Sequence, residues 1–236
     1  KKKAEEAEKK KALEAEKKRV AEEESKKKEE KINNEAKVSS GIQKPKVGHC
    51  GILDPLATGL LIIVVGSFTK KAQDFTKMDK SYDATIQLGF TSSTDDEEGE
   101  KLPVNSRQPS EKEVVLALQD FEGAITQVPP AYSAIKVGGK RAYKEARKGK
   151  EVTLEPRAVT IHAIENVEYK YPVLQFNVSV SSGTYIRSLA RDIGNVLKTG
   201  AYLHELRRTS IGSYTIDHAI TMAQLNDQNI ASLIKQ

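Results

Sequence analysis

The sequence predicts an α+β fold in which a mixed, mostly antiparallel sheet is flanked by helices. Segments 82–88, 159–164 and 174–180 alternate apolar and polar residues with a period of two, which is typical of half-buried strands. Helical patterns lie between and after these strands, at 110–120 and 186–197. We therefore expect strands and helices to share one core.

Two helices are expected. Ser110 and Glu113 form the Ser-x-x-Glu pattern of a capping box, which predicts a helix to about Asp120. The second helix follows a break at Ser182-Gly183, because apolar residues then recur with helical spacing at Ile186, Leu189, Ala190, Ile193 and Leu197. Segment 91–100 is predicted as a loop. Its acidic run 95–98 lacks the alternating ligands of a calcium loop, so we expect it to be solvated.

The composition divides the chain near residue 37. Residues 1–37 hold 14 Lys and Arg and 11 Glu, with no aromatic residue, Gly or Pro. Glu and Lys recur there four residues apart, which predicts a charged, partly helical extension over 1–31. This extension is either a solubilising or disordered tail or an arm that binds RNA or a partner. Residues 38–225 are expected to form a single folded domain, followed by a short tail at 226–236.

Composition also narrows the functional classes. The single cysteine, Cys50, excludes an intrachain disulfide, and no Cys-x-x-Cys is present, which favours a reducing compartment such as the cytoplasm. The longest apolar run, residues 60–65, is far shorter than the roughly 20 residues that cross a bilayer. No apolar segment of a secretory signal is visible at the charged start. A net charge of +5 permits a polyanionic partner without requiring one.

The segment 48–59, GHCGILDPLATG, is the most informative for chemistry. Pro55 keeps Asp54 out of the helical region, so this carboxyl group can be presented into a cleft with few rotamers. The alternative is that Asp54 serves as a turn residue or a helix cap. His49 is more typical of a structural hydrogen-bonding group than of a base, and no second His lies at metal-ligand spacing.

The segment 182–191, SGTYIRSLAR, takes a strand through a glycine turn into a helix. Tyr185 and Arg187 lie at this junction, where unpaired backbone N–H groups favour anions. Placed against a buried carboxylate, Arg187 would hold that carboxylate ionised. The alternative is that Arg187 and Arg191 form the solvated face of an amphipathic helix.

A basic segment lies between these two. Residues 131–157 hold eight Lys and Arg and three Glu, with Tyr132 and Tyr143 interleaved. Basic side chains follow phosphates and aromatic rings stack on bases, so a nucleic-acid surface is plausible, although a solvated basic helix fits equally well. A smaller basic group with the same ambiguity comprises His204, Arg207 and Arg208.

At these positions, over about Lys46 to Ile220, the sequence closely resembles the bacterial TruB family of tRNA pseudouridine synthases. GHCGILDPLATGLL resembles the catalytic-aspartate motif of that family, DKSYDATIQLG its next motif, and SGTYIRSLARDIG its third. The segments QVPPAYSAIKVGGKRAYKEAR and LRRTSIG are also similar to family segments. Several motifs in the same order make the resemblance specific.

The resemblance implies the pseudouridine synthase fold and isomerisation of the T-loop uridine of tRNA, at position 55, to pseudouridine. The base must leave its stack before any side chain can reach it. Asp54 would be the catalytic residue, acting as a nucleophile or as a base on the sugar. Tyr82 would stack on the uracil, Tyr185 would lie near the base, Arg187 would keep Asp54 ionised, and His49 would fill the vacated space.

The resemblance also implies partners. The expected partner is the T-arm of tRNA, without a guide RNA or a membrane, and the chain is expected to be a monomer. The residues expected to contact RNA are Lys136, Lys140, Arg141, Tyr143, Arg207 and Arg208. Because the reaction is redox-neutral and needs no activated donor, neither a cofactor nor a metal is implied.

Two departures from the family pattern are visible. Residues 41–46 run directly into the Gly-His motif, so the N-terminal part of the catalytic domain is expected to be shortened. The chain ends soon after Ile220, so the C-terminal RNA-binding appendage of many members is expected to be absent or vestigial. The alternative function is a T-arm binding or folding protein with weak or no turnover.

Overall fold

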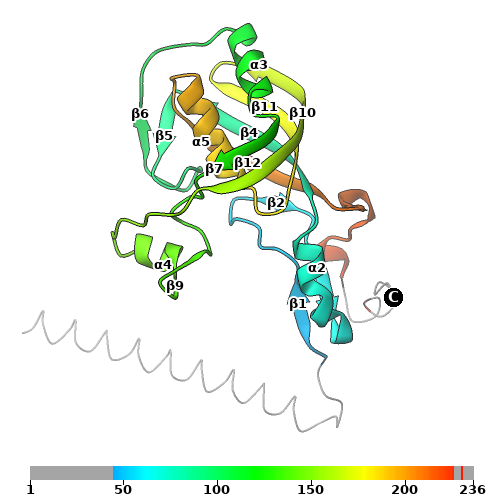
Figure 1. The fold of residues 1–236 in the computed structure, drawn as a ribbon. Helices are drawn as coiled ribbons and strands as arrows, with labels where there is room; N and C mark the ends of the chain where they lie inside the picture. The colour runs from blue at the N-terminus through cyan, green and yellow to red at the C-terminus, as the bar shows by residue number, and fades with distance from the viewer. Residues whose placement is uncertain (1–44, 226–229, 231–236) are drawn as a thin grey trace, which may run out of the picture. The chain divides into compact units, whose positions relative to one another are not determined.

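The structure is a computed structural model that describes residues 45–225 and residue 230 (Figure 1). The predicted extension at 1–37 and most of the tail at 226–236 lie outside the described residues. In the described part of the chain, no helix is both long enough and apolar enough to cross a membrane.

A seven-stranded sheet organises the domain. Its order is β13-β12-β4-β11-β10-β7, and β2 pairs with β12 beside this path. The pairings along the path are antiparallel, whereas β2 runs parallel to β12, so the predicted mixed, mostly antiparallel sheet is confirmed. The strands are β2 (Thr58–Gly59), β4 (Lys80–Leu88), β7 (Gly123–Gln127), β10 (Arg157–Lys170), β11 (Val173–Val180), β12 (Ala201–Ile211) and β13 (Tyr214–Thr215).

Three small two-stranded antiparallel sheets complete the strands of the described residues. They are β1 (Val47–His49) with β3 (Ile63–Val65), β5 (Phe90–Ser92) with β6 (Lys101–Pro103), and β8 (Lys136–Val137) with β9 (Lys140–Arg141). The predicted loop at 91–100 therefore begins inside a strand, and turns follow it.

Both predicted helices are present. Ser110 caps α3 (Glu111–Gln119), and the Ser110 and Glu113 side chains form the expected capping box. The helix α5 (Ile186–Val196) begins after the glycine turn at residue 183. The shorter helices are η1 (Gly66–Lys71), α2 (Ala72–Thr76), α4 (Ala142–Ala146), η2 (Ile216–His218) and η3 (Met222–Gln224).

The core lies between one face of the sheet and the helices α3 and α5, which lie together over the sheet in Figure 1. Strand residues such as Ile86 and Leu174 pack there with Leu189 and Ile193 of α5, and all four are fully buried. Burial of each such side chain stabilises the fold by about 1.5–3 kcal/mol.

The sequence pattern does not predict β12, although this strand pairs with β4, β13 and β2. Bulges shift its register between Leu203 and Glu205 and between Arg208 and Ser210. The buried residues Leu203 and Leu206 are consequently three positions apart, which breaks the alternation that identifies a strand.

Candidate active site

The loop that carries Asp54 is attached to strand β12 where the loop ends. Gly59 lies opposite Arg208 in the parallel β2–β12 pairing, and the Leu60 N–H donates to the Arg208 carbonyl at 2.8 Å. Gly59 has a φ of +102°, and a Cβ there would lie 2.3 Å from the Arg208 carbonyl oxygen. Only glycine fits this approach, which holds the loop close to the sheet.

The Asp54 carboxylate is held by Arg187 from the first turn of α5. The Arg187 Nε donates to Asp54 Oδ2 and its Nη2 donates to Asp54 Oδ1, both at 2.8 Å. The side chain of Arg187 is 5% exposed and that of Asp54 is 31% exposed. Arg187 is therefore not part of a solvated helix face, and the two-point contact fixes the direction of the carboxylate while one side stays open.

A second carboxylate, Asp96, completes this cluster. Its Oδ2 lies 3.5 Å from the Arg187 Nη1, and its Oδ1 accepts hydrogen bonds from the Thr94 hydroxyl and from the Glu98 N–H at 3.1 Å. The side chain of Asp96 is 4% exposed. The prediction that the acidic run 95–98 is solvated is wrong here, because the buried guanidinium of Arg187 requires carboxylate partners.

Asp95 is also largely shielded from solvent, and it forms an ion pair with an arginine of α5. The Arg191 Nη1 lies 2.9 Å from Asp95 Oδ2, and the Arg191 Nη2 donates to the Val128 carbonyl at 2.9 Å. Burial raises the pKa of Asp95, and the Arg191 guanidinium opposes that rise. Arg191 thus ties two loops to α5, so the alternative that it belongs to a solvated helix face does not describe its guanidinium.

Two tyrosines lie within the electrostatic reach of Asp54. Burial raises the pKa of the Tyr82 phenol, opposed by Arg208, and the negative charge of Asp54 adds to the rise. Burial also raises the pKa of the Tyr185 phenol, opposed by Arg157 and Arg187, and Asp54 again adds to the rise. Both phenols are therefore neutral hydroxyl groups beside the carboxylate at neutral pH.

The loop 94–98 is fastened to β12 by a second set of contacts around Glu97. Its carboxylate lies 2.9 Å from the Lys101 Nζ and 2.8 Å from the His204 Nδ1. Desolvation raises the pKa of Glu97, but hydrogen bonds from His204, Lys101 and Tyr202 outweigh it and lower the pKa to about 2. Burial, together with Glu97, raises the pKa of Tyr202 to about 12.

His49 lies at the end of β1, opposite Ile63, and is exposed. Its side chain forms no hydrogen bond or ion pair with any residue that the structure describes. Its ring is accessible to a ligand. That it fills the space vacated by a flipped base stays a prediction.

The predicted RNA-binding residues of the basic segment lie on the β8–β9 hairpin and at the start of α4. Lys136, Lys140 and Arg141 are exposed. Tyr143 is half-buried, and the Arg147 guanidinium lies 5.6 Å from the centre of its ring. This surface is accessible to a polyanion.

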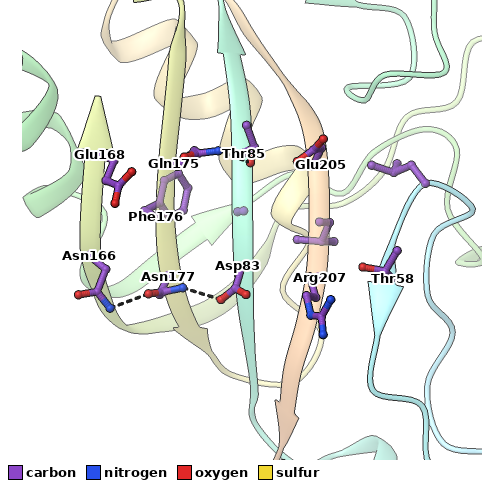
Figure 2. Close-up of a pocket in the computed structure, with 13 residues that line it drawn as sticks. Thr58, Asp83, Thr85, Asn166, Glu168, Gln175, Phe176, Asn177, Glu205 and Arg207 are labelled. Carbon is purple, nitrogen blue, oxygen red and sulfur yellow. Dashed lines mark hydrogen bonds between the residues drawn. The ribbon is translucent and has the colours of Figure 1, made fainter. Parts of the chain in front are cut away.

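Arg207 lies in different surroundings. It is exposed on the face of the sheet away from α3 and α5, where it lines a hollow of about 610 Å³ together with Asp83, Glu168 and Glu205 (Figure 2). On the floor of this hollow, an Asn166–Asn177–Asp83 hydrogen-bond chain crosses three strands. Asp83 lies opposite Arg207 in the β4–β12 pairing and Glu205 lies two residues before it, so two nearby carboxylates oppose the binding of a phosphate there.

Arg208, unlike its neighbour Arg207, is buried. It is 1% exposed, so the prediction of a surface contact to RNA at this residue is wrong. Side chains alternate between the faces of a strand, so Arg207 reaches the outer face and Arg208 points into the core.

Sequence reasoning missed Asp96 and the buried position of Arg208. Asp96 lies in a polar, acidic segment, where no periodic pattern of apolar residues indicates burial. Its partner Arg187 is 91 residues away in sequence. In the described residues, no three His, Cys, Asp or Glu side chains are placed to hold a metal ion.

Comparison with known proteins identifies the family. The model of the TruB family pseudouridylate synthase N-terminal domain matches residues 37–186, and the model of the tRNA pseudouridylate synthase B C-terminal domain matches residues 187–233. The tRNA pseudouridine synthase B of Burkholderia mallei is 47% identical over 184 residues, which cover 78% of this chain and 61% of the relative. That of Clostridium tetani is 44% identical over 190 residues, covering 80% of this chain and 66% of the relative.

The chain thus spans about three fifths to two thirds of the length of these relatives. Among solved structures, a Cbf5-Nop10-Gar1 complex matches with a TM-score of 0.58 and 29% identity, over 77% of this chain and 45% of that chain. An H/ACA RNP bound to a substrate RNA containing 2'-deoxyuridine matches with a TM-score of 0.56 and 27% identity, over 77% and 44%. The fold described above is shared with these proteins.

Proposed function

Because the chain belongs to the TruB family of pseudouridylate synthases, we propose that it isomerises the T-loop uridine of tRNA, at position 55, to pseudouridine. The observation that carries the proposal is the two-point contact between Arg187 and Asp54, near the buried Tyr82 and the half-buried Tyr185. A carboxylate with a fixed direction and one open side is suited to attack or deprotonate a sugar.

The reaction rearranges bonds without an electron donor or acceptor. The bond between ribose C1′ and uracil N1 breaks, the uracil turns, and a bond between C1′ and C5 forms. The proton on C5 leaves, and N1 takes up a proton. Asp54 acts either as a nucleophile at the sugar or as a base on it. Arg187 holds the carboxylate in place for either role, which reduces the reorganisation that the reaction requires.

The two tyrosines are proposed to contact the flipped base. A flipped uracil requires a surface that replaces its lost stacking, and base–aromatic stacking contributes about 1–3 kcal/mol per base. Tyr82 is proposed as this surface and Tyr185 as a neighbour of the base. His49, exposed and without a partner among the described residues, is proposed to occupy space that the base vacates.

The RNA is proposed to be bound as a tRNA T-arm by a monomer without a guide RNA. The exposed hairpin residues Lys136, Lys140 and Arg141, with Tyr143, would meet its phosphates and bases. We place this activity in the cytoplasm, in keeping with the free thiol of Cys50.

Residues 38–225 are proposed as the catalytic domain. The two family models meet at residues 186 and 187, inside this range. Strand β12 from the second part pairs with β4 and β2 from the first, which supports a single domain.

The test uses a tRNA transcript labelled with tritium at C5 of uridine, because the C5 hydrogen is lost when the new bond forms. We expect the wild-type chain to release tritium from the T-loop uridine. The Asp54→Asn variant should be slower by at least about 1,000-fold, with a Kd for tRNA within about threefold of wild type. The control is Asp120→Asn, an exposed residue after α3, which should leave the rate unchanged.

A wild-type chain that binds the transcript tightly and releases no tritium would contradict the proposal. That outcome would favour the alternative, a T-arm binding or folding protein.

A further inference from the structure

Arg208 is a buried cation without a carboxylate partner. It is 1% exposed, and it forms no ion pair within the described part of the chain. Lys80, which is 8% exposed, lies close enough for the charge of Arg208 to lower the pKa of Lys80, after the larger effect of burial. A buried, unpaired charge is costly, so its contacts call for an explanation.

The guanidinium of Arg208 donates to both ends of the loop that carries Asp54. Its Nε donates to the Leu60 carbonyl at 2.8 Å, and its Nη2 donates to the Gly51 carbonyl at 3.3 Å. The Leu60 N–H donates to the backbone carbonyl of Arg208, so both backbone groups of Leu60 are bound to this one residue. Asp54 lies between the two attachment points.

The same guanidinium also reaches Tyr82. The two residues are opposite each other in the antiparallel β4–β12 pairing, and the Arg208 guanidinium lies close enough to the Tyr82 phenol to oppose the rise that burial causes in its pKa. Arg208 therefore holds the aspartate loop and lies beside Tyr82 at the same time, while Arg187 contacts Asp54 from α5.

We propose that Arg208 is a positioning residue for turnover, which sets the Tyr82 ring and the Asp54 loop in their relative places without touching the RNA. This inference rests on the proposed synthase activity. Lysine carries the same charge as Arg208, but it cannot reach Gly51, Leu60 and Tyr82 from one planar group.

The first experiment compares Arg208→Lys with wild type in the tritium-release assay. We expect kcat to fall by at least about 30-fold and KM to change by less than about threefold, because a displacement of about 1 Å costs up to about 100-fold in rate. Arg107→Lys is the control, since Arg107 is exposed and pairs with Glu113 away from the site. It should leave both constants unchanged.

A double-mutant cycle separates positioning from general support of the fold. If Arg208 acts through the Tyr82 hydroxyl, Arg208→Lys should slow a Tyr82→Phe enzyme much less than it slows wild type. Equal slowing in both backgrounds, or a kcat of Arg208→Lys within threefold of wild type, would overturn the inference.

Hydrogen exchange of the segment 50–62 provides a readout that does not depend on activity. We expect exchange there to be at least about tenfold faster in Arg208→Lys than in wild type or Arg107→Lys, because one clamp of the loop is lost. Arg208→Gln serves if the lysine variant does not fold.

The two proposals fail in different ways. A wild-type chain without tritium release would contradict the proposed function. The exchange rates would still decide whether Arg208 holds the loop, and unchanged exchange would overturn that role.

Discussion

At the scale of single residues, the site depends on buried charges of opposite sign that compensate each other. Arg187 lies between Asp54 and Asp96, and two of these three side chains are 5% exposed or less. Removing one partner from such a set leaves a buried charge that is only partly compensated. The stability and the activity of this site are therefore coupled.

Asp96→Asn tests this coupling. The amide keeps the shape of the side chain but loses the charge beside Arg187, so we expect the free energy of unfolding to fall by about 1–3 kcal/mol. The rate of pseudouridine formation should also fall, because Arg187 then orients Asp54 less firmly. Urea unfolding and the tritium assay give the two quantities.

Glu98→Gln is the matched control for Asp96→Asn, because Glu98 is an exposed neighbour on the same loop. An equally stable and equally active Asp96→Asn variant would show that this carboxylate has no such role.

Residue-scale chemistry could be predicted only in part from the sequence. The constrained aspartate and the arginine at the start of α5 were recognisable from Pro55 and from the glycine turn at residue 183. The burial of Asp96 and Arg208 was not, because charged residues reveal burial only through partners that are distant in sequence.

At the scale of elements, strand β12 supports several parts of the site. It pairs with the end of the aspartate loop through β2, holds Tyr82 through Arg208, and holds the loop 94–98 through His204 and Leu203. A change on this strand therefore reaches more than one part of the candidate site.

The Glu97 contacts predict a pH dependence of stability. A carboxyl group whose pKa falls from 4.5 to about 2 on folding stabilises the fold above pH 4.5, and this contribution is lost as the pH falls towards 2. We expect Glu97→Gln to be less stable than wild type at pH 6 and the difference to shrink as the pH falls below 4.5. The effect is small, because Glu97 is 42% exposed.

Urea unfolding of both proteins between pH 6 and pH 3.5 measures this difference. A difference that is constant over that range would mean that the contacts of Glu97 do not depend on its charge.

Helices and strands could be predicted from the sequence where their pattern of apolar and polar residues, or their cap, is regular. The helix α3 was predictable because its cap is local, and β4 and β11 because their alternation is regular. Strand β12 was not, because its two bulges place buried side chains out of period.

At the scale of the whole molecule, charge is distributed unevenly. The β8–β9 hairpin and α4 present exposed cations, whereas the outer face of the sheet places Arg207 near the carboxylates of Asp83 and Glu205. The net charge of +5 therefore understates the attraction of one surface for a polyanion.

The salt dependence of tRNA binding tests this distribution. Replacing Lys136, Lys140 and Arg141 together with Gln should weaken binding and reduce the slope of log K against log salt by about 3, since each phosphate contact contributes about 0.9. Arg207→Gln should change the slope by less than about 1. Similar changes from both variants would contradict the proposed division between the two surfaces.

The attachment of the aspartate loop to a late strand has a consequence for synthesis of the chain. Gly59 and Leu60 obtain their backbone partner at residue 208, nearly 150 residues later. A nascent polypeptide that has not yet delivered this strand from the ribosome holds the aspartate without its support. The support of the aspartate loop is therefore complete only after strand β12 has been synthesised and the sheet is nearly complete.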